Sequence, residues 1–209
     1  DLHLCDRRQR QMCIRDRSVS DKFLVTNIRR YLNSDNPKLG EDRLLHEISE
    51  FSCPKNPDVE NFLKNNAVEF TKKSQSVTYF VYSLESKRLV GYFSIALKSL
   101  TVRGEMVSKT VKKKLLRISE LDENLDTYNM SAYLIAQLAK NYTNDCDKEI
   151  TGAELIELAW MVIEELQYMA GGVVAFLEAE PREKLLSFYQ TNRFQQFDTR
   201  QTTSSEGQH

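Results

Sequence analysis

The chain has 209 residues, of which 41% are hydrophobic and 28% are charged, and this composition is typical of a globular protein rather than a disordered one. Lys and Arg together number 29 and Asp and Glu 30, which excludes a protein whose whole surface binds nucleic acid. No apolar run is long enough to span a membrane, so we expect no membrane association.

The first 17 residues carry five arginines and three aspartates without a helical or strand period. Their string RRQRQMCIRDR resembles translated sequencing-adapter DNA, so we interpret residues 1–17 as a non-native, disordered extension. A basic arm that binds nucleic acid is the alternative. A single domain is expected over 18–197, and the polar residues 198–209 are interpreted as a tail of a truncated chain.

Helical periods dominate the first part of this domain. Apolar residues recur at helical spacing over 22–32 and again over 41–51, which predicts two helices. A third helix is expected from Pro57 to Lys73, because Asn56 can cap it and a proline suits its first turn.

The period then changes to that of a strand. Residues 76–84 are rich in β-branched and aromatic side chains, and 88–100 are almost continuously apolar, so we expect an antiparallel hairpin at the centre of a sheet. A helix is expected over 105–118, where lysines and an arginine crowd the positions outside the apolar stripe. These basic residues form either a solvated face or a docking patch for a polyanion.

Strands and helices alternate in the last part of the chain. An apolar strand over 129–140 precedes a loop and a helix over 152–170, which begins with a T-x-x-E capping box. A strand over 171–180, a short helix opened by Pro181 and a final extended piece beginning at Phe194 complete the order.

The junction of a strand with a capped helix is where binding chemistry is expected. The first turn of a helix presents unpaired backbone amides, and the helix dipole adds positive charge, so phosphate is the natural ligand there. Gly152 stands at the first helical position, where the absence of a Cβ would let a phosphate approach the backbone closely.

The cysteines and histidines of the sequence favour neither a metal site nor a catalytic thiol. The four cysteines contain no C-x-x-C pair and the three histidines are widely separated, so we expect no metal site and reduced thiols in a cytoplasmic protein. No histidine partner can be argued for Cys53, which disfavours a nucleophilic thiol.

The order of elements over 57–197 resembles the GNAT acyltransferase superfamily, and LLSFYQTNRF at 185–194 is similar to the F-Y-x-x-x-G-F string of many members. The resemblance implies a mixed α+β fold with helices flanking a central, mostly antiparallel sheet. It also implies transfer of an acetyl group from acetyl-CoA to an amine. The family closes with one more strand, which 198–209 do not supply, so we expect that strand to be missing.

The strand YLIAQLAKNY at 133–142 lies where the family has its acetyl-CoA pyrophosphate motif, Q/R-x-x-G-x-G/A. Lys140 and Tyr142 replace the two glycines, and the ammonium of Lys140 could contact phosphate as a point charge. A backbone amide of 134–137 would polarise the thioester carbonyl. The expected cofactor-binding residues are therefore Leu134, Ile135, Gln137, Lys140, Asn141 and Gly152.

The resemblance also implies roles near the end of the chain. Tyr189 would protonate the departing CoA thiolate, with a half-buried packing tyrosine as the alternative. Glu178 is the candidate general base, ahead of Glu180 and Glu69, and each of these could instead be a solvated carboxylate. Arg193 replaces the glycine of the family string at a position that often needs a left-handed backbone, which costs a non-glycine residue roughly 1 kcal/mol.

Three functions are compatible with these features. The first is an N-acetyltransferase that acts on an unidentified amine. The second is a toxin-like protein that acetylates aminoacyl-tRNA and is neutralised by an antitoxin-like partner. The third is a binding protein that keeps the fold without the activity. The oligomeric state is open, and a dimer is compatible with the sequence.

Overall fold

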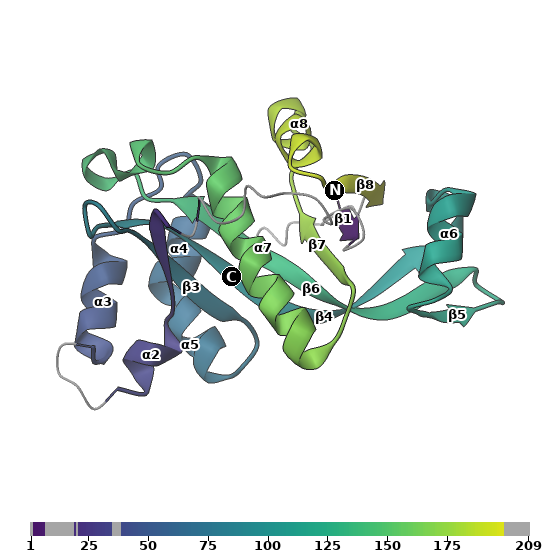
Figure 1. The fold of residues 1–209 in the computed structure, drawn as a ribbon, viewed down its shortest axis with the longest axis horizontal. Helices are drawn as coiled ribbons and strands as arrows, with labels where there is room; N and C mark the ends of the chain where they lie inside the picture. Colours follow the sequence, from purple (N-terminus) through teal and green to yellow (C-terminus); the bar gives the residue numbers. More distant parts are fainter. Residues whose placement is uncertain (1, 7–18, 20, 35–38, 199–209) are drawn as a thin grey trace, which may run out of the picture.

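The computed structural model describes residues 2–6, 19, 21–34 and 39–198, and it is built around one eight-stranded sheet (Figure 1). The sheet has the order β2-β3-β4-β6-β7-β1-β8, with β5 beside β6. Every strand pair is antiparallel except β6 with β7, as expected for the predicted mostly antiparallel sheet. The strands are β1 (Leu2–Asp6), β2 (Phe23–Asn27), β3 (Val77–Ser83), β4 (Leu89–Arg103), β5 (Glu120–Asp122), β6 (Thr127–Lys140), β7 (Val174–Glu178) and β8 (Gln195–Asp198).

Helices cover both faces of this sheet. The helical elements are α2 (Arg29–Leu32), α3 (Glu41–Ser49), α4 (Pro57–Asn65), α5 (Ala67–Lys72), η2 (Gly104–Met106), α6 (Lys109–Leu115), η3 (Thr143–Lys148), α7 (Gly152–Ala170) and α8 (Glu183–Thr191). The predicted cap at Asn56 is confirmed, because its side chain accepts a hydrogen bond from the amide of Asp58. The predicted helix 57–73 is interrupted at Asn66, and the helix after Pro181 begins two residues later, at Glu183.

The helix predicted over 22–32 is wrong for its first half. Residues Phe23–Asn27 form β2, which pairs with β3 in antiparallel register, and only the short α2 follows. The side chain of Asn27 accepts a hydrogen bond from the amide of Arg29 and so marks the change from strand to helix. A short apolar run fits either period, and pairing with a neighbouring strand decided between them.

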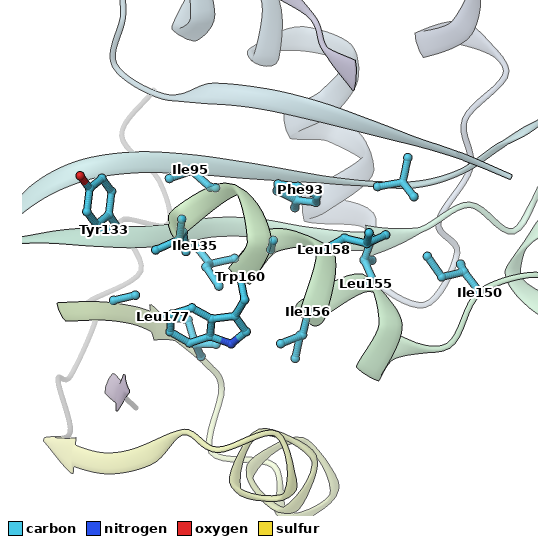
Figure 2. Close-up of a cluster of buried hydrophobic side chains, with 14 of the residues drawn as sticks. Phe93, Ile95, Tyr133, Ile135, Ile150, Leu155, Ile156, Leu158, Trp160 and Leu177 are labelled. Carbon is cyan, nitrogen blue, oxygen red and sulfur yellow. The ribbon is translucent and has the colours of Figure 1, made fainter. Parts of the chain in front are cut away.

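The core consists of two large clusters on opposite faces of the sheet. Neighbouring strand residues alternate between them: Phe80 and Tyr92 belong to the cluster beneath α3, α4 and α5, and Val81 and Phe93 to the cluster beneath α7. Figure 2 shows the second cluster, in which side chains from β4, β6 and β7 meet the buried face of α7. A third, smaller cluster lies beneath α6.

The N-terminal residues differ from the prediction in one respect. The sequence predicts no element in 1–17, yet Leu2–Asp6 form β1, which pairs antiparallel with both β7 and β8. The remaining residues of 1–17, and 199–209 of the expected tail, lie outside the described residues. Among the helices that the structure describes, none is both long enough and apolar enough to cross a membrane.

Candidate active site

The parallel strands β6 and β7 separate soon after they meet. They pair only at Tyr133↔Ala175 and Leu134↔Phe176, although β6 continues to Lys140. On its other edge β6 stays paired with β4, but the register jumps from Ile135 to Gln137, which leaves Ala136 as an extra, bulged residue. We call the diverging segments 135–140 and 177–178 the β6–β7 fork.

Some of the expected cofactor-binding residues lie at the fork, and one of these is buried in the core. Leu134 makes the last backbone pair with β7, and Ile135 and Gln137 flank the bulge. Ile135 is buried in the cluster beneath α7, and Figure 2 shows it in the same group as Leu177 of β7 and Trp160 of α7. No sequence signal predicts the bulge at Ala136, because a bulge is a property of the pairing between two strands.

Asn141 fastens the loop that leaves β6. Its side-chain oxygen accepts hydrogen bonds from the amides of Ser52 and Thr143, and its side-chain nitrogen donates to the carbonyl of Leu89. Asn141 is only 4% exposed, so these three bonds satisfy a fully buried amide. Its side chain therefore holds three chain segments together and has little capacity left for a ligand.

Lys140 is also used internally. Its ammonium donates to the carbonyl of Ile150 at 2.8 Å and to the carbonyl of Asp147. Both carbonyls belong to the loop that leads into α7, and within this loop Asn144 and Asp145 have left-handed backbones. Lys140 therefore stabilises the loop before α7, at a position where the family pattern has glycine.

The N-terminus of α7 carries the capping box that the sequence predicts. The hydroxyl of Thr151 accepts from the amide of Glu154, and the carboxylate of Glu154 accepts from the amide of Thr151. Lys22 donates to the same carboxylate at 3.2 Å. Burial works against the ionisation of Glu154, but these hydrogen bonds and the Lys22 charge outweigh it, so the pKa of Glu154 is lowered.

Gly152 is the point where α7 meets α8. A Cβ at Gly152 would lie 2.9 Å from the Cζ atom of Phe188, which is closer than carbon atoms pack. We expected a phosphate to approach the backbone at Gly152, but the Phe188 ring occupies the space beside this glycine. In the first turn of α7 the amide of Glu154 bonds to Thr151, and the amides of Gly152 and Ala153 are those that intrahelical bonding does not use.

Tyr189 lies next to this contact, in a group of aromatic rings. Its ring centroid is 5.3 Å from that of Phe188 and 5.9 Å from that of Phe194, and Phe194 in turn stacks on Trp160. Tyr189 packs against the cluster beneath α7, and burial raises the pKa of its phenol. A raised pKa keeps the phenol protonated at neutral pH, as a proton donor requires.

The end of α8 has the left-handed backbone that the family resemblance implies. Arg193 has φ of 72°, and the amide of Phe194 bonds back to the carbonyl of Tyr189. The left-handed turn directs Phe194 into the core, where it is 1% exposed.

The candidate carboxylates lie at the end of β7. Glu178 is the last residue of β7 and is exposed. Glu180 forms an ion pair with Arg182 at 2.6 Å in which both side chains are largely exposed. Glu69 is on α5, on the opposite side of the sheet from α7, and pairs with Lys73.

Burial raises the pKa of the Cys53 thiol, which opposes formation of a nucleophilic thiolate. Among the described residues, no three His, Cys, Asp or Glu side chains are grouped as a metal site would need.

A pocket of about 440 Å³ lies elsewhere, between α7 and the strands β2 and β3. Its lining includes Phe23, Val25, Tyr79, Met161, Glu165 and Met169. None of the expected site residues lines it.

No protein-family model and no curated protein matches this chain. Solved structures do match. AtaT complexed with acetyl-methionyl-tRNAfMet is 16% identical, with a TM-score of 0.56 over 81% of this chain and 84% of that chain. A tyrosine-to-phenylalanine mutant of KacT is 19% identical, with a TM-score of 0.55 over 81% of this chain and 85% of that chain. A tyrosine-to-phenylalanine mutant of the AtaT toxin, bound to the C-terminus of the antitoxin AtaR, is 15% identical, with a TM-score of 0.51 over 82% of each chain. The chain therefore shares the fold of AtaT and KacT, in which helices flank a mostly antiparallel sheet, as the resemblance to the GNAT superfamily implies.

Proposed function

We propose that this protein is an N-acetyltransferase that moves an acetyl group from acetyl-CoA directly to an amine at the β6–β7 fork. The observation that carries the proposal is the bulge at Ala136, two residues beyond the last β6–β7 pair. Backbone groups on the β7-facing edge of β6 beyond that point are not used by β7. The amides of a pantetheine arm can bond to such an edge as an added strand would.

Each step of acetyl transfer requires a particular group at or near the fork. The amine nitrogen attacks the thioester carbonyl carbon, and a backbone amide of 134–137 stabilises the oxyanion that forms. The C–S bond then breaks, and the thiolate takes a proton from the phenol of Tyr189. Glu178 is the proposed acceptor of the proton that the amine loses.

The phosphates of the cofactor are assigned to the first turn of α7. Its backbone amides and its dipole favour an anion. Gln137 supports this site from the bulge, while Lys140 and Asn141 hold the loop 141–151 in place through their internal hydrogen bonds. Gly152 contributes by letting the Phe188 ring of α8 approach the start of α7, and we assign the neighbouring Tyr189 to the fork.

Acetyl-CoA binding and turnover test the proposal separately. Acetyl-CoA at millimolar concentration should raise the melting temperature, because it binds the native state alone. Tyr189→Phe should reduce turnover by about 10²–10⁴-fold while leaving that shift unchanged, because the ring stays and the transferable proton is lost. Slow hydrolysis of acetyl-CoA serves as the assay, since water replaces the unidentified amine.

Tyr168→Phe is the matched control, because Tyr168 is 86% exposed on α7 and should leave turnover unchanged. Equal hydrolysis by wild type and Tyr189→Phe would remove the acid role from Tyr189. Absence of any melting shift from a folded protein would favour a binding protein that keeps the fold without the activity.

Aminoacyl-tRNA is the second candidate for the amine. It is favoured by the fold that this chain shares with AtaT in its complex with acetyl-methionyl-tRNAfMet. Incubation with acetyl-CoA and a mixture of charged tRNAs should then block the α-amino groups, and expression should arrest growth. Turnover of free amines with charged tRNA untouched would exclude this acceptor.

A further inference from the structure

The strands β4 and β6 run far beyond the fork in the other direction. Their ladder continues to Arg103↔Thr127, and the connection between them holds η2, α6 and β5. Figure 1 shows this part extending away from the helices on both faces of the sheet. We call residues 97–132 the arm.

The arm carries half of the large apolar side chains that are exposed among the described residues. Four of them lie between α6 and the turn after β5: Leu116 (51% exposed), Ile118 (38%), Leu121 (37%) and Leu125 (71%). The apolar stripe of α6 already has its own cluster beneath it, which includes Leu115. These four side chains all fall within residues 116–125 and lie outside the cluster beneath α6, and such a concentration of exposed apolar side chains is typical of an interaction site.

Basic side chains directly precede these apolar residues in the chain. Lys109 and Lys113 stand four residues apart on α6 and therefore share one side of it, and Arg117 follows in the turn after the helix. Lys112 is paired with Asp126 at 2.8 Å, whereas no acidic side chain in the described part of the chain pairs with those three. Leu116 follows Lys112 and Lys113 by four and three residues, which places an exposed leucine among the lysines.

The neighbouring acidic residues decide between two kinds of anionic partner. Glu120, Asp122 and Glu123 lie on or next to β5, directly after the basic helix. A phosphate backbone carries charge along its whole length and would be repelled there, and it offers nothing for the leucines. A polypeptide can place carboxylates on the lysines, apolar side chains on the leucines and no charge on β5.

We infer that the arm is a docking surface for an acidic, amphipathic polypeptide segment. Its carboxylates pair with Lys109, Lys113 and Arg117, and its apolar side chains cover Leu116, Ile118, Leu121 and Leu125. This surface is a binding function in addition to acetyl transfer and does not depend on it.

Fluorescence polarisation with defined probes tests the inference on the full chain. The main probe is a labelled synthetic helical peptide of about 20 residues, with leucine along one face and glutamate elsewhere. The comparison probes are a peptide of the same composition with its leucines dispersed, polyglutamate, and a single-stranded RNA of similar length. The amphipathic peptide should bind saturably with a Kd below about 1 mM and more tightly than the other three.

Two sets of variants separate the charged from the apolar contribution. Lys109→Glu with Lys113→Glu and Arg117→Glu should weaken binding by about tenfold or more, as should Leu116→Ser with Leu125→Ser. The matched control, Lys64→Glu with Lys72→Glu and Lys73→Glu, changes the net charge equally on α4 and α5 and should alter binding less than about twofold. All of these side chains are at the surface, and an unchanged melting temperature confirms that each variant is folded.

The inference is overturned if the amphipathic peptide does not saturate. It is also overturned if RNA binds more tightly and the leucine variants leave that binding unchanged, since the arm would then be a nucleic-acid surface. Equal effects of the control set and the α6 set would reduce the binding to nonspecific charge, which contradicts the inference as well.

Discussion

The two sides of the β6–β7 fork are held by different forces. On the β6 side, Asn141, Lys140 and the capping box of α7 fasten the loop 141–151 with hydrogen bonds. On the α8 side, Tyr189 and Phe194 are held mainly by ring contacts. A buried hydrogen bond that loses one partner leaves the other unsatisfied, whereas ring packing tolerates changes that keep volume. The β6 side should therefore be the more sensitive to small changes.

Replacing Asn141 should give the largest loss of stability. Asn141→Ala removes the side-chain partner of two partly buried amides and one buried carbonyl, so we expect the free energy of unfolding to fall by about 2–4 kcal/mol. Urea denaturation measures this loss. Asn65→Ala is the control, because Asn65 bonds to Asn61 at the surface and should cost less than about 0.5 kcal/mol. Equal losses for the two variants would contradict the anchoring role of Asn141.

Gly152→Ala tests the place where the two sides meet. The added Cβ collides with the Phe188 ring, and this strain should outweigh the better helix propensity of alanine, for a net loss of about 1–2 kcal/mol. In a Phe188→Leu background the collision is relieved, and the same change should be neutral or stabilising. A double-mutant cycle measures the coupling. Absence of coupling would show that α8 does not rest on Gly152.

Arg193→Gly should stabilise the α8 side by about 1 kcal/mol, since glycine adopts the left-handed backbone without the Cβ penalty. Thermal denaturation reports the gain as a higher Tm. Arg182→Gly is the matched control, because φ is −96° at Arg182 and glycine relieves no strain there. A gain at Arg182 as large as that at Arg193 would count against the strain.

The pH dependence of stability should carry a small contribution from Glu154. Because its pKa is lower in the folded state than the ordinary value of 4.5, its contribution is fully present above that value and is lost as the pH falls through the folded pKa. Glu154→Gln keeps a capping side chain without the charge, so it should flatten the stability profile in this acid range. Glu69→Gln, at an exposed pair, should leave the slope unchanged. Identical slopes for both variants and wild type would show that Glu154 is not linked to folding.

Local signals predicted much of the fold. The cap at Asn56, the capping box of α7 and the β3–β4 hairpin depend on neighbours in sequence, and all three are confirmed. The left-handed backbone at Arg193, which the resemblance to the family string implied, is also confirmed. The strand β2 was missed because an isolated apolar run does not show what it pairs with.

The contacts of the candidate site residues could be predicted from local sequence signals to a smaller extent. The sequence alone determined which elements meet at the fork, since a strand followed by a capped helix and a second strand can be read from periodicity and caps. Only the tertiary structure decided what individual residues do there. Asn141 and Lys140 bond to segments that periodicity does not bring together, Gly152 makes room for a ring 36 positions later in the chain, and Ala136 is bulged because β4 and β6 shift register. Side-chain partners and strand registers are long-range properties, and they exist only once the chain has packed.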